Sequence, residues 1–144
     1  MFEQLDDGST FRHTGDSPDY VPPGAAVPPH FTEAAAAVLH AERLTRLYDA
    51  AARRMERGSE RHRLAQLICD DVIAEFAAAR VELERVVSRY SVEQQRRGLD
   101  RDVIERSVRV GVVSAAGARG ATAEAQAIAE TAVGWALAAL PRDD

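Results

Sequence analysis

Apolar residues recur at steps of three and four over about seven helical turns between residues 64 and 90. This spacing places one apolar stripe along a single helix face, and no alternation of period two competes with it. The stripe comprises Leu64, Leu67, Ile68, Val72, Phe76, Ala79, Leu83, Val86, Val87 and Tyr90. The pattern therefore predicts one long helix that packs against neighbours along its whole length.

The sequence also predicts where this helix begins and ends. Ser59 suits the N-cap position, and Gly98 follows the last expected turn. The residues from Ser91 to Gln94, Ser-Val-Glu-Gln, resemble a capping box, so the helix either runs on through this point or breaks and restarts there.

Three further helices are predicted over residues 32–57, 100–116 and 122–140, each beginning with a Thr or Asp cap and followed by a Gly or Pro. Residues 108–113 also have strand character, but no second strand candidate is available for pairing. The expected fold is an all-α bundle of about four helices, one of them long and central.

Residues 1–30 differ in composition and are expected to form an extended Pro-rich arm, distinct from a helical bundle domain over residues 31–144. Five of the six prolines lie in this arm, and its five acids against one arginine give it a net charge of −4. The arm is either a solvated tail or a segment that docks on its own bundle or on a neighbour. The apolar anchors for docking would be Phe2, Leu5, Phe11, Tyr20 and Val21.

Residues 111–140 are dominated by alanine, glycine and small polar side chains. The pairs Gly111 with Ala115, Ser114 with Ala118, and Gly134 with Ala138 each place small residues on one helix face. Such faces let another backbone approach closely, and the large residues of the long helix are the expected neighbours. The close contact belongs either to the interior of one chain or to a seam between copies.

Charge and targeting signals narrow the class of protein. All 18 basic residues are arginine, which is typical of a GC-rich genome such as that of a high-GC bacterium or its phage, and the net charge of −5 disfavours nucleic acid as a partner. The N-terminal residues lack a basic region and an apolar core, and the chain has no apolar run of membrane-spanning length. We expect a cytoplasmic protein, or a virion or assembly component if phage-encoded, without membrane association.

A basic cluster surrounds the expected turn between the first two helices. Five arginines against Glu56 and Glu60 give this turn a net charge of +3. The arginines are Arg53, Arg54, Arg57, Arg61 and Arg63. The cluster is either a solvated face or a docking site for an anionic partner, including the acidic arm of another copy.

Within this cluster, Arg57 and His62 are separated by four residues. The spacing is similar to the Arg-x4-His signature of HEPN ribonucleases, and the resemblance covers these six residues. It implies a small all-α bundle that pairs such residues across a dimer to cleave RNA without metal. Histidine would then move a proton near neutral pH, while arginine would hold the scissile phosphate.

Glu75 and Trp135 are candidate ligand-binding residues. Glu75 falls inside the apolar stripe, where a carboxylate must be paired with an arginine or serve a ligand, and Trp135 would line the same pocket. His40 shares a face with Leu44 and Leu47 and is expected in the core. Glu-x-x-His pairs are absent from the sequence around its histidines, so we expect neither a metal site nor a cofactor.

These patterns favour a non-catalytic helical interaction or assembly protein, with no catalytic residues. It would self-associate, or dock on other protein subunits, through its N-terminal arm and its small-residue helix faces. The alternative is a HEPN-like, metal-independent ribonuclease that uses Arg57 and His62. A ligand-binding bundle with Glu75 and Trp135 is a third hypothesis.

Overall fold

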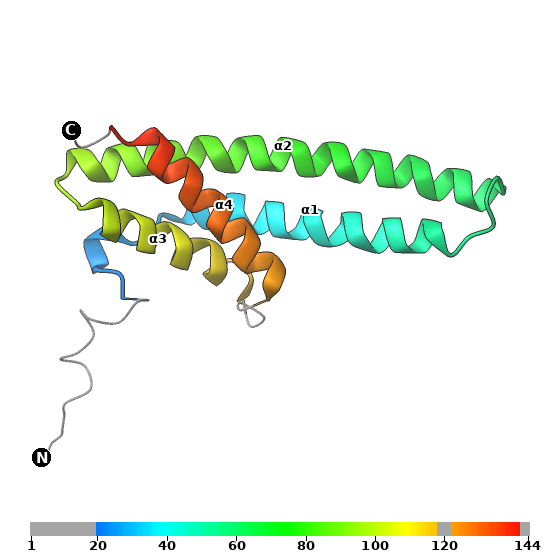
Figure 1. The fold of residues 1–144 in the computed structure, drawn as a ribbon, viewed down its shortest axis with the longest axis horizontal. Helices are drawn as coiled ribbons and strands as arrows, with labels where there is room; N and C mark the ends of the chain where they lie inside the picture. Colours follow the sequence, from blue (N-terminus) through cyan, green and yellow to red (C-terminus); the bar gives the residue numbers. More distant parts are fainter. Residues whose placement is uncertain (1–19, 118–121, 142–144) are drawn as a thin grey trace, which may run out of the picture.

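The computed structural model describes residues 20–117 and 122–141, and every α-helix in this part of the chain belongs to one bundle (Figure 1). Four α-helices follow a short 3-10 turn, η2 (Pro23–Ala25). They are α1 (Pro29–Arg53), α2 (Glu60–Arg96), α3 (Arg101–Ser114) and α4 (Ala123–Ala139). The predicted all-α bundle, with the second helix longest, is confirmed.

The bounds of α1 differ from the sequence prediction at both ends, and the helix ends at Arg53 instead of residue 57. α1 begins three residues earlier than expected, because Pro29 suits the first helical position, where its missing N–H costs nothing. α2 continues through Ser91, so of the two alternatives left open by the sequence the uninterrupted helix is the correct one. The Ser91 hydroxyl donates to the carbonyl of Val87 at 2.8 Å inside the helix, instead of capping a new one.

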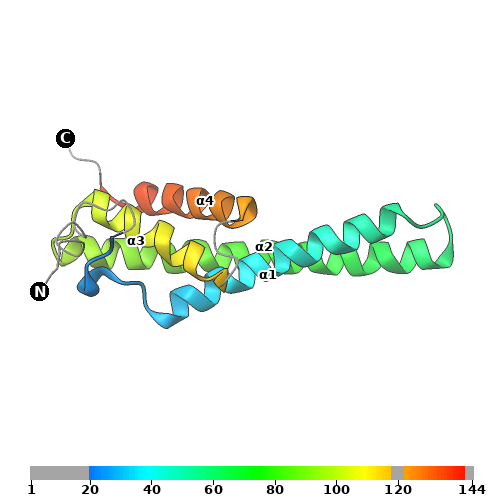
Figure 2. The same cartoon turned by 90° about the horizontal axis from the view of Figure 1, so that it is seen from below.

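α1 and α2 form an antiparallel hairpin that is the longest part of the molecule (Figure 2). Buried residues on α2 recur at heptad-like steps along the seam between the two helices. They include Ala65, Cys69, Val72, Leu83, Val87 and Tyr90. The turn over residues 54–59 closes through Gly58 at φ 84°, and the Ser59 hydroxyl oxygen accepts a hydrogen bond from the His62 N–H at 3.1 Å.

α3 and α4 cover only the half of the hairpin that lies away from this turn (Figures 1 and 2). At about 1.5 Å per residue, α2 is about 55 Å long, whereas α3 and α4 are about 21 and 25 Å long. The main core lies where all four helices meet. We call this four-helix half the base and the two-helix half, residues 44–75, the distal hairpin.

The core of the base combines large side chains from three helices with small ones from the fourth. Phe31, Leu83, Ile104, Val108 and Val112 are fully buried there. α4 contributes a stripe of buried alanines, namely Ala125, Ala129, Ala132 and Ala136. Small residues therefore do allow α4 to pack closely, as its composition suggested.

The individual small-residue pairs were partly mispredicted. Gly111 is buried, but the side chains against it are Val27 and Phe31, which come from the segment before α1 and from α1 itself rather than from the long helix. Gly134 and Ala138 are exposed, and a β-carbon on Gly134 would meet no atom within 4 Å. Ser114 is also exposed, and its predicted partner Ala118 lies outside the described residues.

The segment from Tyr20 to Pro28 packs on the base of its own chain. The Tyr90 hydroxyl donates a hydrogen bond to the carbonyl of Ala25, and the Arg106 guanidinium donates to the carbonyl of Tyr20 at 3.2 Å. Tyr20 and Val21, two of the predicted anchors, are half-buried. The other anchors, Phe2, Leu5 and Phe11, lie outside the described residues.

Candidate functional site

Exposed large hydrophobic side chains are concentrated on the distal hairpin. Among the described residues, five of the six such side chains lie there, with between 42% and 59% of their surface exposed. They are Leu47, Leu64, Leu67, Ile68 and Ile73, and only Val81 lies elsewhere. A cluster of this kind, in contrast to scattered single residues, is typical of an interaction surface.

Four of these five side chains lie on one side of the hairpin. On α2, Leu64, Leu67 and Ile68 fall within an arc of about 100°, adjacent to the buried seam. On α1, Leu44, Leu47 and Ala51 fall within a similar arc, displaced from the seam in the same rotational sense. Because the two helices are antiparallel, equal rotational senses lead to the same side of the hairpin. We call these six residues the apolar face.

The apolar face does not continue along the base, although that side of the hairpin is open there too. By the same helical geometry, the positions that follow on α2 are Glu82, Arg85 and Arg89, which are exposed. Arg85 forms an ion pair with Glu82 at 2.5 Å, and this contact, with the charges of Arg89 and His30, lowers the pKa of Glu82. The open side is thus a solvated ionic surface at the base and apolar only on the distal hairpin.

Charged residues flank the apolar face asymmetrically along α2. Glu60 and Arg61 precede Leu64 on the side nearer the turn, while Asp71 and Glu75 follow Ile68 on the side nearer the base. All four charged residues are exposed. The apolar face therefore lies between an acidic segment nearer the base and the turn cluster, whose net charge is +3.

The opposite side of the distal hairpin contains a cleft of about 610 Å³. Arg57 and His62 both line it, so the structure brings the two residues of the HEPN-like spacing to one place. Arg57 lies in the turn and His62 in the first turn of α2. Other lining residues include Asp49, Arg53, Cys69, Asp70 and Ile73. Arg53 is held by Asp49 at 3.0 Å.

The predicted basic cluster is spread over the turn and both adjoining helix ends. Arg53, Arg54, Arg57, Arg61 and Arg63 are all exposed. Arg53 and Arg57 line the cleft, whereas Arg61 lies beside the apolar face. The five side chains therefore belong to more than one surface.

The environments predicted for Glu75 and His40 are wrong. Both side chains are exposed, because the stripe to which they were assigned lies partly on the open side of the hairpin. Trp135 is half-buried on α4, and the Arg80 guanidinium lies over its ring, 5.8 Å from the ring centroid. A ligand site formed by Glu75 and Trp135 stays a prediction.

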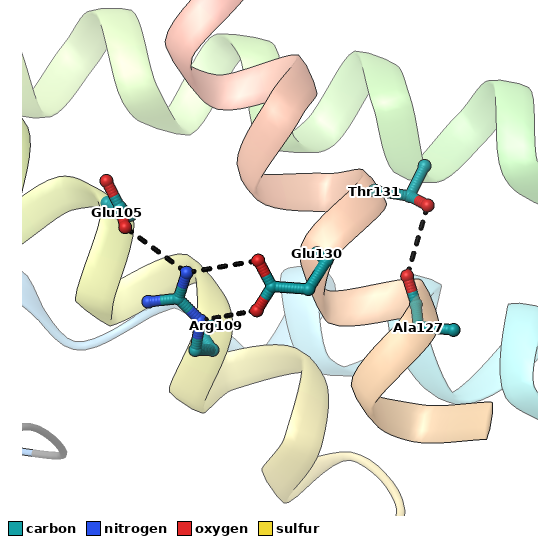
Figure 3. A network of polar contacts seen from close by, with 5 residues as sticks. All are labelled: Glu105, Arg109, Ala127, Glu130 and Thr131. Carbon is teal, nitrogen blue, oxygen red and sulfur yellow. Dashed lines mark hydrogen bonds and ion pairs between the residues drawn. The ribbon is translucent and has the colours of Figure 1, made fainter. Parts of the chain in front are cut away.

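The most connected polar group belongs to the base and joins α3 to α4 (Figure 3). Arg109 Nε lies 2.8 Å from Glu130 Oε2, and Arg109 Nη2 lies 3.2 Å from both Glu130 Oε1 and Glu105 Oε2. Hydrogen bonding to Arg109 lowers the pKa of Glu130, and the same contacts raise the pKa of Arg109. This bidentate group therefore holds α3 and α4 together.

The apolar face was missed as a site because its residues were assigned to the interior. Leu64, Leu67 and Ile68 were predicted to face inward, but Ala65, Cys69 and Val72 occupy the seam instead. A usable signal was present in the helix lengths. Two helices of 14 and 17 residues cannot cover one of 37, so part of its apolar surface must lie open or meet another chain.

Comparison of the chain with family models, with curated proteins and with solved structures gave no match. Within residues 20–117 and 122–141, no group of three or more His, Cys, Asp or Glu side chains is arranged to hold a metal ion. None of the helices in these ranges combines the length and apolarity required to cross a membrane. The helical bundle and its distal hairpin are therefore the evidence on which a function can be proposed.

Proposed function

We propose that this protein is a helical interaction module that docks on a protein partner through the apolar face of its distal hairpin. The observation that supports this most strongly is the concentration of exposed Leu and Ile side chains on the one part of the bundle where only two helices pack together. The base then acts as a rigid mount, and the hairpin projects the docking surface away from it (Figure 2).

The energetic basis is hydrophobic burial. Each Leu or Ile taken from water into a contact contributes about 1.5–3 kcal/mol when fully buried, and less here because each side chain is already partly covered. The five Leu and Ile side chains of the apolar face together form the apolar centre of such a contact, which a partner with matching apolar side chains would cover. The N-terminal arm remains a second proposed contact through Phe2, Leu5 and Phe11, since Tyr20 and Val21 are engaged on their own base.

Site-specific photo-cross-linking in the native host tests the docking surface. Benzoylphenylalanine in place of Leu67 is expected to capture a discrete protein partner, whereas the same probe in place of Val81, equally exposed on α2 but outside the face, captures none. Absence of any product at position 67 above the level at position 81 would show that the apolar face is not a docking surface.

A second candidate function, RNA cleavage, is supported by one observation. Arg57 and His62 line a common cleft that is wide enough for a small anionic group. The purified chain would then cleave a single-stranded RNA without metal, and His62→Ala would abolish cleavage while His40→Ala, at an exposed histidine on α1, would not. A parent protein without ribonuclease activity removes this candidate.

A further inference from the structure

We propose that the occupant of the apolar face is a second copy of this chain, docked antiparallel about a twofold axis that passes close to Leu67 and Ile68. This inference rests on the proposed function and names its partner. Two hairpins then form a four-helix arrangement in which α2 packs on α2 of the other copy. Three observations support this choice.

The first observation is shape. α3 and α4 pack on the other side of the hairpin, where Arg46 and Arg80 contact α4, so among the described residues no helix covers the side that carries the apolar face. A two-helix face is matched in width and length by another two-helix face of the same kind, and stacking two such faces gives the four-helix bundle architecture. Within residues 20–117 and 122–141, the distal hairpin is the element of matching dimensions that a second copy would present.

The second observation is charge. An antiparallel copy places the turn cluster of one hairpin, which has a net charge of +3 and includes Arg61, opposite the acidic segment of the other α2, at Asp71 and Glu75. Each such pairing occurs twice, because a twofold interface repeats every contact. Two hairpins aligned with their turns together would instead bring one arginine-rich turn against another. The charges therefore select the antiparallel arrangement and oppose the aligned one.

The third observation is register. The position midway between Arg61 and Asp71 is residue 66, and the position midway between Arg61 and Glu75 is residue 68. Leu67 and Ile68, which bound the apolar arc of α2, therefore lie at the level along the helix where the twofold axis must pass if these charges pair. The apolar and ionic patterns thus give one common register.

Sedimentation of the full chain over a range of concentrations tests the proposal. The parent chain is expected to give the mass of a dimer, and Leu67→Glu is expected to weaken association at least about tenfold, because a carboxylate would then be buried at the axis. Val81→Glu is the matched control, since Val81 is exposed on the same helix outside the face and its replacement should leave association unchanged. Circular dichroism verifies that each variant keeps its helix content, and Leu64→Glu replaces Leu67→Glu if the latter does not fold.

Charge reversal tests the antiparallel arrangement itself. Asp71→Arg with Glu75→Arg in one chain should weaken self-association, and Arg61→Glu in another chain should do the same. Mixing the two variants should restore a dimer, because each acidic end then meets a basic end in both halves of the interface. The reversal Glu84→Arg, at an exposed α2 position off the face, should have no effect.

The possible results separate this inference from the proposed function. A monomeric parent chain, a dimer unaffected by Leu67→Glu, or a mixture that fails to restore association would each overturn the antiparallel dimer. If the photo-probe at position 67 then captures a different protein, the docking surface stands and only the partner is wrong. If it captures nothing, both proposals fall.

Discussion

Val27 packs against Gly111 so closely that a β-carbon on Gly111 would lie 2.8 Å from Val27 Cγ2 and 3.0 Å from Phe31 Cε1. Gly111 lies inside α3, and Val27 lies in the segment that precedes α1. The absence of a side chain on α3 therefore creates the space in which the N-terminal segment reaches the core. Position 111 therefore requires glycine for packing, although alanine is the more favourable residue inside a helix.

Gly111→Ala is expected to destabilise the fold by about 1–2 kcal/mol. The added methyl group would clash with the short, β-branched side chain of Val27, and the cost of this clash exceeds the gain in helix propensity. Gly134→Ala is the matched control. Gly134 is an exposed glycine within α4 with no atom near its missing side chain, so this change should stabilise by about 0.5–1 kcal/mol. Urea unfolding of both variants measures the difference. Equal effects of the two substitutions would contradict the packing account, and Val27→Ala combined with Gly111→Ala should recover part of the loss.

Tyr90→Phe is expected to lower the free energy of unfolding by about 1–2 kcal/mol, because it removes the hydroxyl that donates to the buried carbonyl of Ala25.

Burial also raises the pKa of the Tyr90 phenol in the folded protein. The neutral phenol therefore stabilises the fold at pH values below its unfolded pKa of about 10, and this stabilisation is lost as the pH rises through the folded pKa. Chemical unfolding between about pH 9 and 11 should show a steeper loss for the parent chain than for Tyr90→Phe.

Glu130→Gln is expected to reduce stability at neutral pH by less than about 1 kcal/mol, because the Arg109–Glu130 pair is largely exposed and Arg109 keeps Glu105 as a partner. The pKa of Glu130 is lowered in the folded state, so its contribution is present above the unfolded pKa and lost as the pH falls through the folded value. The parent and variant should therefore converge between about pH 5 and 3. An unchanged difference in unfolding free energy across this range would show that the pair does not contribute. Glu84→Gln, at an exposed position on α2, is the control for the change in net charge.

The thermal midpoint of the parent chain is expected to rise with protein concentration, because an associating folded state gains stability by mass action. Leu67→Glu should give a midpoint that is independent of concentration and close to that of the dilute parent chain. Differential scanning calorimetry over about a hundredfold range of concentration makes the comparison. A parent midpoint that does not move with concentration would show that folding and association are not coupled.

The helices were predictable because their signals are local. Ser59 and Thr122 cap α2 and α4 as expected, each accepting a hydrogen bond from the backbone N–H three residues later. The inner face of α3 was also predictable, since Ile104, Val108 and Val112 recur at helical spacing and are fully buried. Such features depend only on residues close together in the sequence.

The environments of residues on the distal hairpin were not predictable in the same way. Periodicity identifies an apolar helix face but not what covers it, so Leu64 and Ile68 were grouped with Val72 although only Val72 lies in the seam. Val27 and Gly111 are 84 positions apart in the sequence, so no local pattern predicts their contact. The cleft that joins Arg57 to Asp70 likewise requires knowledge of how the hairpin closes.

The end of the hairpin at residues 54–59 lies far from both ends of the described chain. Pro141 accepts a hydrogen bond from Arg101 just beyond the turn that follows α2, and Tyr20 accepts one from Arg106 on the same helix, so both lie at the base (Figure 1). A fluorescent label or a surface tether attached at either end would thus leave the protruding helices unobstructed. The molecule can be immobilised, imaged or fused to a reporter without blocking the region that is proposed to make its contacts.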